Sequence, residues 1–254
     1  MLSIKSKHEI DLMKKSGEIL AACHEMLKRI IVPGITTIEL DRIVEEYIIK
    51  NGGIPSFKGY KNALGAQDFP ASICTSINDE VVHGIPGLTE LKDGDIISID
   101  IGVILNGYHS DAARTFPVGN VSEEAKKLIK VTEESFYKGI SKAVPGNRIV
   151  DISAAIQSHV EANGFSVVRD YVGHGIGREM HEAPQVPNYR TRQRGPRLIP
   201  GMTLAIEPMV NAGNYPVRLH SNRWTVLTAD GSLSAHYENT IAITDEEPLI
   251  LTIL

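Results

Sequence analysis

The sequence predicts an α+β protein in which helices lie behind an antiparallel sheet and acidic side chains lie in front of it. Three observations predict this class: capped segments with helical spacing, strands with alternating apolar residues, and a repeat that relates the two halves of the chain. With 254 residues and 42% apolar content, the chain can form one large domain or two small ones with a substantial core.

Four helices are expected, arranged in two pairs. Capping boxes mark the beginnings of the first two helices, with Ser6 and Glu9 in one and Thr36 and Glu39 in the other. Pro-Gly and Asn-Gly-Gly sequences end these helices, because proline and glycine interrupt helical backbone. The expected ranges are 6–32, 36–50, 122–143 and 150–162.

A repeat with an offset of 112 residues relates the two helix pairs. Val32-Pro33-Gly34 recurs as Val144-Pro145-Gly146, and Asn51-Gly52 recurs as Asn163-Gly164. Common turn chemistry is the alternative explanation, but a constant offset favours true repetition. We therefore expect a single catalytic domain built of two related halves, about 1–118 and 119–254, with a shared site near a pseudo-twofold axis.

A β-hairpin is expected over residues 95–115. Apolar residues alternate along its first strand on the face that packs on the helices, while Asp100 occupies the other face. The dipeptide Asn106-Gly107 favours a two-residue turn, which would place Asp100 opposite Ala113 and make Asp111 its diagonal neighbour at roughly 7–8 Å. Two carboxylates that face each other across this gap repel unless a cation lies between them.

Three further candidate ligands lie in apolar or glycine-rich segments. His174 sits between glycines, Glu207 ends an apolar strand expected at 202–208, and Glu238 lies in a strand expected at 236–243. Taken singly, each could be a loop histidine or a satisfied surface acid. Burying all four carboxylates together is prohibitive unless cations neutralise them. With the two aspartates, the set suits two ions of Co, Mn, Fe or Zn, which together are a hydrolytic device.

Composition and charge restrict the cellular compartment and the binding partners that we expect for the protein. The net charge of −5 indicates neither nucleic acid nor an acidic membrane surface as a partner. Cys23 and Cys74 make neither a disulfide framework nor a cysteine-based zinc site, which favours a reducing compartment. No apolar run reaches membrane-spanning length, and the first residues lack an apolar leader. We expect a cytoplasmic monomer that binds no DNA and no membrane.

Six short motifs along the chain are typical of one known family. They are Ser76-Ile77-Asn78, Val82-His83-Gly84-Ile85-Pro86, Asp93-Gly94-Asp95-Ile96, Gly173-His174-Gly175-Ile176-Gly177, Pro200-Gly201-Met202-Thr203 and Ile206-Glu207-Pro208-Met209-Val210. These motifs strongly resemble those of the methionine aminopeptidases, in particular the short, type I bacterial form, and the resemblance runs over essentially the whole chain. It implies the pseudo-twofold "pita-bread" fold of the creatinases and aminopeptidases, a curved antiparallel sheet with two helix pairs on its convex face.

The resemblance also implies roles for individual residues. Two divalent ions would be held by Asp100, Asp111, His174, Glu207 and Glu238. A hydroxide between the ions would attack the scissile carbonyl, with Glu207 as general base, His83 near the scissile amide and His181 stabilising the oxyanion. Surface-loop histidines are the alternative for the last two. The methionine pocket would be lined by Phe69, Cys74, Met180 and Trp224, with core packing as the alternative for Trp224.

This reading predicts removal of the initiator methionine from nascent polypeptides and peptides with a small second residue. One feature of the sequence departs from the methionine aminopeptidase pattern, and another lies outside it. Ala63 and Ala66 would reduce one wall of the pocket and loosen the preference for methionine. An arginine-rich loop is either a solvated surface or a contact with ribosomal RNA, and it contains Arg190, Arg192, Arg194 and Arg197.

Two other functions stay open on the sequence. A prolidase or Xaa-Pro aminopeptidase-like exopeptidase would share the fold, although such enzymes usually add an N-terminal domain for which no residues are available here. A non-catalytic binding homologue would share the fold without the chemistry, although it would not need five buried ligands.

Overall fold

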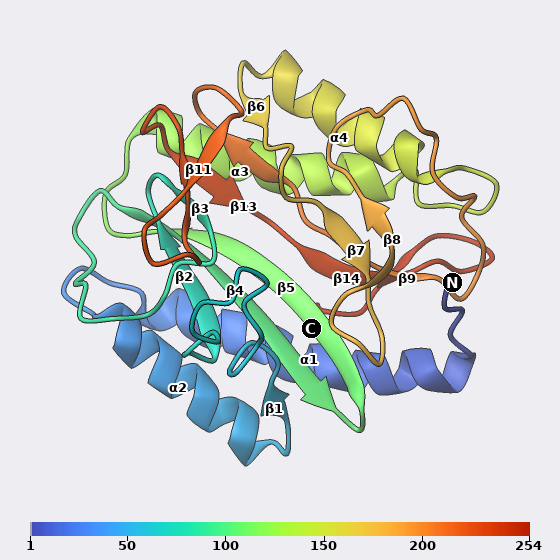
Figure 1. Ribbon diagram of the computed structural model, residues 1–254, viewed down its shortest axis with the longest axis horizontal. Coiled ribbons are helices and arrows are strands. Elements are labelled where there is room, and N and C mark those ends of the chain that lie inside the picture. Colours follow the sequence, from blue (N-terminus) through green and yellow to red (C-terminus); the bar gives the residue numbers. More distant parts are fainter. Residues whose placement is uncertain (1) are drawn as a thin grey trace.

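The computed structural model describes residues 2–254 of the chain. Its helices and strands form two helix pairs with short antiparallel strands between them (Figure 1). The strands of the first half are β1 (Ile54–Pro55), β2 (Ile73–Ile77), β3 (Glu80–Val82), β4 (Ile96–Leu105) and β5 (Tyr108–Pro117). Those that follow are β6 (Ser166–Val167), β7 (Gly173–Gly175), β8 (Glu182–Val186), β9 (Thr203–Ile206), β10 (Met209–Asn211), β11 (Val217–Leu219), β12 (Val226–Thr228), β13 (Ser234–His236), β14 (Asn239–Ala242) and β15 (Leu249–Ile250).

The helices are α1 (Lys7–Ile30), α2 (Thr37–Lys50), α3 (Glu123–Ile140) and α4 (Ile149–Ala162). Both predicted capping boxes are confirmed, because the N-cap side chains and the third-residue glutamates exchange contacts at the start of α1 and of α2. The third helix ends three residues earlier than the expected 143. There the chain tightens into a turn in which the N–H of Ala143 donates to the carbonyl of Ile140.

The two helix pairs repeat at the offset seen in the sequence. Shifting the range of α2 by 112 residues gives the range of α4, residue for residue. Gly34 and Gly146, which precede these helices, share a left-handed backbone with φ of 95° and 92°. The N–H of Gly34 donates to Leu91, and that of Gly146 donates to Leu198, in equivalent turns. The recurring Pro-Gly sequence therefore encodes the same local structure twice.

The β4–β5 hairpin has the predicted register. Leu105 pairs with Tyr108 and Asp100 pairs with Ala113, while Asp111 lies opposite Gly102. Asn106 and the glycine after it have φ of 53° and 78°, the backbone that a tight two-residue hairpin turn requires. The hairpin turn thus determines which residues of β5 lie on the same face as Asp100.

Each helix pair packs against the strands of its own half. The aliphatic residues of β4 that alternate with Asp100 are fully buried against α1 and α2, whereas α3 and α4 cover β9, β10 and β14. In Figure 1 the blue pair α1 and α2 lies below the strands and the yellow-green pair α3 and α4 lies above them. The helices therefore occupy the side of the strands opposite the acidic residues, as the pita-bread fold requires.

The two halves meet along β5 and β14. The N–H of Glu238 donates to the carbonyl of Ala113 at 2.9 Å. The backbone of Asp111 exchanges two hydrogen bonds of 2.9 Å with the hydroxyl of Thr240, which accepts from its N–H and donates to its carbonyl. These contacts bring acidic residues from both halves to one seam.

Two strands expected to be continuous are interrupted. The segment 202–208 gives β9, which ends at Ile206, and the chain resumes as β10 at Met209. The segment 236–243 ends β13 and begins β14, with two residues between them. Pro208 has no N–H for a ladder, and its carbonyl instead accepts from Tyr237 at 3.2 Å. The paired interruptions leave Glu207 and Glu238 outside regular strand geometry.

Between residues 2 and 254, none of the helices combines the length and the apolar character needed to cross a membrane.

Candidate metal centre

A cavity of about 180 Å³ opens between the strands of the two halves. All residues predicted for the site line this cavity, although they come from strands and loops spread along the chain from residue 69 to residue 238. The predicted ligands there are Asp100 on β4, Asp111 on β5, His174 on β7, Glu207 after β9 and Glu238 before β14. The predicted substrate residues there are Phe69, Cys74, His83, Met180, His181 and Trp224.

The spacing of the polar atoms fits metal ligation better than hydrogen bonding. Nε2 of His174 lies 3.8 Å from Oδ2 of Asp111 and 3.5 Å from Oε1 of Glu207. These separations exceed the range of an N–H···O hydrogen bond. Two ligands that each lie about 2.1 Å from one ion are about 3–4 Å apart. The geometry is that of groups arranged around a common cation.

Two overlapping groups of potential ligands are present. Asp111, His174 and Glu238 form one, and Asp100, His236 and Glu238 form the other, with ligand atoms within 4.8 Å of one another in each. Buried atoms of this set have no hydrogen-bond partner, namely Oδ1 of Asp100, Oδ1 of Asp111, Oε1 of Glu238 and Nε2 of His236. Buried polar atoms without partners are costly, so the set fits a site completed by metal ions.

The pKa values of the same residues also indicate a site that is completed by cations. Burial raises the pKa of Asp111, Glu207 and Glu238 well above the usual range, and neighbouring carboxylates raise it further. Burial also raises the pKa of Asp100 to about 7 and lowers that of His174 to about 3. Carboxylates in such surroundings resist ionisation unless a cation compensates their charge.

The glycines around His174 allow neighbouring strands to approach it. A Cβ atom at Gly173 would lie 2.4 Å from the carbonyl of Ala205, and one at Gly175 would lie 2.4 Å from that of Ala183. Nδ1 of His174 lies 2.9 Å from the carbonyl oxygen of Gly175. A proton on Nδ1 would donate to this oxygen and leave Nε2 free to bind a metal.

An aromatic pocket adjoins the acidic residues. Phe69 and Trp224 meet edge to face with ring centroids 5.2 Å apart, and His83 lies 6.4 Å from the same indole. The indole N–H donates to the carbonyl of Gln67 at 2.8 Å, which holds the ring in place. The pocket is therefore closed by rigid aromatic side chains.

The expected loosening of the pocket wall at Ala63 and Ala66 stays a prediction. Neither alanine lines the cavity, whose lining includes the aromatic side chains of Phe57 and Tyr60. Ala63 is exposed to solvent and Ala66 is half-buried.

His181 stands at the rim of the cavity. Its Nδ1 lies 2.6 Å from the hydroxyl of Tyr60, and its ring centroid lies 4.3 Å from that of His174. His83 adopts a left-handed backbone with φ of 60°, and burial lowers its pKa to about 4. Burial also lowers the pKa of His181, so the folded structure favours the neutral form of both histidines that line the cavity.

Sequence reasoning missed several lining residues. Tyr60 lies in a loop without periodicity, so no sequence pattern marks it. His236 could have been found, because it precedes Glu238 by two residues and strand alternation places such residues on one face. The other missed residues are Phe57, Val82, Tyr171, Val172 and Met209.

Comparison with known proteins identifies the family. The sequence pattern of metallopeptidase family M24 matches residues 11–245. The chain is 62% identical to a methionine aminopeptidase of Clostridium perfringens over 100% of both chains, and 57% identical to methionine aminopeptidase 1 of Bacillus subtilis over 99% of both. The chain therefore belongs to metallopeptidase family M24, and within that family to the methionine aminopeptidases.

Solved structures confirm the fold. A methionine aminopeptidase from Thermotoga maritima superposes with a TM-score of 0.96 at 45% identity, covering 100% of both chains. A prolidase from Pyrococcus furiosus superposes with a TM-score of 0.75 at 23% identity, covering 99% of this chain and 65% of that one. The second likeness shows the fold alone. The predicted resemblance is confirmed, and use of a divalent metal follows from the family.

Proposed function

We propose that this chain removes the initiator methionine from nascent polypeptides and peptides with a small second residue, using two divalent metal ions. The observation that carries the proposal is the junction of two features in one cavity. Carboxylates and one imidazole with buried atoms that lack hydrogen-bond partners line it, and an aromatic pocket adjoins them. The names of the relatives support the same reaction.

The residues that would hold the ions divide into two groups. Asp111 and His174 stand on one side, Asp100 on the other, and Glu238 belongs to both groups. Glu207 lies beside His174 and completes the set. When bound, such ions lower the pKa of a water between them and polarise a carbonyl oxygen. An oxygen-rich set with imidazole suits Co, Mn, Fe or Zn.

The protein groups supply proton transfer and positioning. Glu207, with its raised pKa, would accept the proton of the attacking water and pass it to the leaving amine. If the hydroxyl of Tyr60 donates to Nδ1 of His181, the remaining proton resides on Nε2, which would donate to the developing oxyanion. His83 would contact the scissile amide from the pocket side.

The pocket would select the methionine side chain. Phe69 and Trp224 offer aromatic faces to a thioether, while Cys74 and Met180 add polarizable, buried surface. A flexible, unbranched side chain fits a closed pocket of this size, whereas a charged side chain would lose its hydration without a partner.

Peptide hydrolysis by the metal-free protein, with Co, Mn, Fe or Zn added back singly, tests the proposal. Cleavage of Met-Ala-Ser that depends on metal and declines as the second residue grows is the expected result. Cleavage of Xaa-Pro peptides in preference to Met-Ala-Ser would favour the prolidase-like alternative. Metal binding without hydrolysis of either class would favour a binding homologue.

We also infer that the chain is one catalytic domain of two related halves, about 1–118 and 119–254, which the matching ranges of α2 and α4 support. We further propose that it acts as a monomer in the cytoplasm. The two buried, free cysteines, Cys23 and Cys74, are consistent with that compartment.

A further inference from the structure

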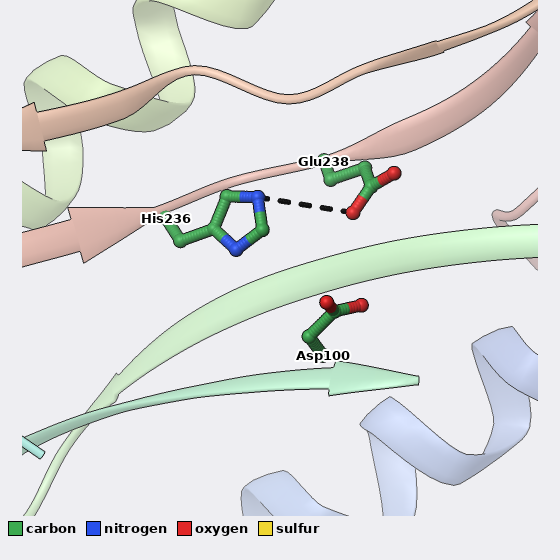
Figure 2. Close-up of side chains that lie close together, drawn as sticks. All are labelled: Asp100, His236 and Glu238. Atoms are coloured by element: carbon green, nitrogen blue, oxygen red, sulfur yellow. Dashed lines mark ion pairs between the residues drawn. The ribbon is translucent and has the colours of Figure 1, made fainter. Parts of the chain in front are cut away.

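We propose that His236 is a sixth protein ligand of the metal centre and binds, through Nε2, the ion held by Asp100 and Glu238. The inference deepens the dinuclear site proposed above and rests on it. In Figure 2 the side chains of His236 and Glu238, which come from one segment of the chain, lie opposite the carboxylate of Asp100 on β4. These three residues are also one of the two groups whose ligand atoms lie within 4.8 Å of one another.

The geometry of His236 matches that of His174. Nε2 of His236 lies 3.8 Å from Oε2 of Glu238 and 4.0 Å from Oε2 of Glu207. The corresponding distances of His174 to its two carboxylates are 3.8 Å and 3.5 Å. Both imidazoles are thus too far from the carboxylates for hydrogen bonds and at the separation of ligands that share an ion.

His236 is buried, and its Nε2 atom makes no hydrogen bond within the protein. Its residue is 2% exposed, and Nε2 has no hydrogen-bond partner. An apolar side chain of similar size would avoid this cost. An ion at this position would satisfy the nitrogen together with the unpartnered Oδ1 of Asp100 and Oε1 of Glu238.

The backbone of His236 is held firmly enough for a ligand. Its N–H donates to the hydroxyl of Thr115 at 2.9 Å, and its carbonyl accepts from the same hydroxyl at 2.9 Å. Thr240 holds the backbone of Asp111 in the same way across the seam. Paired threonine contacts therefore fix one residue in each group of ligands.

The proposal makes the two halves of the centre chemically alike. Each ion would have one imidazole and one aspartate, with Glu238 common to both and Glu207 between the two imidazoles. Without His236, the ion near Asp100 would have oxygen ligands only. A nitrogen ligand there shifts the preference of that site toward Fe, Co and Zn and away from Mn.

Proton NMR of the cobalt-loaded full-length protein tests the ligand directly. A ring N–H of an imidazole bound to paramagnetic Co(II) gives a strongly shifted resonance that disappears in D2O. Two such resonances are expected when cobalt fills both sites. His236→Ala should remove one of them and His174→Ala the other. Because the unsubstituted protein already reports the number of bound imidazoles, the test holds even if a variant fails to fold.

The remaining outcomes separate this inference from the proposed function. A single shifted resonance at full occupancy, lost only in His174→Ala, would overturn the role of His236 and leave the metal centre intact. Failure of the protein to bind cobalt at all would overturn both.

Calorimetric titration of the metal-free protein with Co(II) gives a second measure. Affinity at one site should fall about ten- to a hundredfold or more in His236→Ala. His159→Gln is the matched control, since this half-buried histidine on α4 contacts Glu134 at 3.1 Å and lies outside the centre. Equal affinities in His236→Ala and the control would contradict the proposal.

Discussion

The hydroxyl of Tyr60 lies 2.6 Å from Nδ1 of His181, and the two rings meet edge to face with centroids 5.4 Å apart. The two residues are 121 positions apart in the chain. The contact orients the imidazole at the rim of the cavity, and when the hydroxyl is the donor it leaves the imidazole proton on Nε2, which can then donate to a substrate.

Tyr60→Phe should therefore reduce kcat for Met-Ala-Ser by about fivefold with little change in KM, since one hydrogen bond is worth about 1 kcal/mol. His181→Ala should reduce kcat by about 10²–10³-fold, because it removes the donor itself. Steady-state kinetics of the single and double variants measure both effects. The double variant should be no slower than His181→Ala, and additive losses would show that Tyr60 acts independently of His181.

Neutralising a carboxylate of the centre should stabilise the metal-free protein. Burial and the neighbouring Glu238 and Asp100 raise the pKa of Asp111, so its ionised form is unfavourable in the folded state. Asp111→Asn should raise the melting temperature of the metal-free protein by about 3–6 °C, corresponding to about 1–2 kcal/mol, and abolish most of the stabilisation by added cobalt.

The pH dependence of this stabilisation tests whether the raised pKa of Asp111 causes it. A carboxyl whose pKa is raised on folding binds more protons in the folded state, so its destabilising effect grows as pH rises above the unfolded value of 3.8. Calorimetry should therefore find the benefit of Asp111→Asn at pH 7 and none below pH of about 3.5. Asp245→Asn, an exposed change, is the control. A lower melting temperature for metal-free Asp111→Asn at pH 7 would refute the prediction.

Glu9 should stabilise the start of α1 in a pH-dependent way. Its carboxylate accepts from the hydroxyl of Tyr108 at 2.7 Å and from the N–H of Ser6 at 2.8 Å. These bonds, the one from Tyr108 foremost, lower its pKa to about 2. A lowered pKa contributes stability that is complete above the unfolded value of 4.5 and is lost as pH falls toward 2.

Glu9→Gln should accordingly cost about 1 kcal/mol at pH 7, a value reduced from the pKa shift because the side chain is partly exposed to solvent. Urea unfolding between pH 3 and 7 measures the difference, which should shrink below pH 4.5. Glu18→Gln on the exposed side of the same helix should show no such trend. A cost for Glu9→Gln that stays constant with pH would contradict the assignment.

The aromatic wall should determine the preference for methionine. Trp224→Ala removes a wall that Phe69 contacts, so kcat/KM for methionine relative to leucine should fall about 10- to 100-fold. Ala66→Phe should leave the ratio unchanged, because Ala66 does not line the cavity. Steady-state kinetics with peptides that carry methionine, norleucine or leucine at the first position measure this ratio of kcat/KM values. A large change in Ala66→Phe would instead support the expectation that the small residue at this position opens the pocket wall.

The arginine loop provides a test for contact with the ribosome. Arg190, Arg192, Arg194 and Arg197 are all exposed, in a chain whose net charge is −5. If they bind ribosomal RNA, their joint replacement by glutamine should abolish co-sedimentation with ribosomes and leave hydrolysis of short peptides unchanged. The matched control replaces four exposed lysines of the α3 region, Lys126, Lys130, Lys138 and Lys142. Equal co-sedimentation of both variants would leave the loop as solvated surface.

Local chemistry explains the parts of the structure that sequence reasoning predicted. The Asn106-Gly107 turn permits one register, and that register places Asp100 and Asp111 on one face. The capping boxes of α1 and α2 lie within one helical turn, so neighbouring residues suffice to determine them. The repeated Pro-Gly turns likewise depend on backbone conformation that glycine alone adopts easily.

The interrupted strands illustrate where this reasoning fails. Apolar alternation around Glu207 and Glu238 indicates continuous strands, but the chain breaks where the two segments cross and Tyr237 donates to Pro208. Such a break depends on a partner about thirty residues away, and no local pattern records it. The path of the loop before Phe69 is equally hidden from local patterns, because Gln67 in that loop accepts from the indole N–H of Trp224, 157 residues away.

By itself the sequence determined the helix pairs, the hairpin register and the identity of the acidic and histidine residues that gather in the cavity. Ionisable side chains are rare in apolar segments, so they can be recognised there from the sequence alone. Only the tertiary structure decided that His236 joins the acids and that Tyr60 orients His181. The first relationship brings a ligand atom of His236 within 4.8 Å of one of Asp100, from the other half of the chain, and the second joins residues 121 positions apart, so neither can be derived from local sequence.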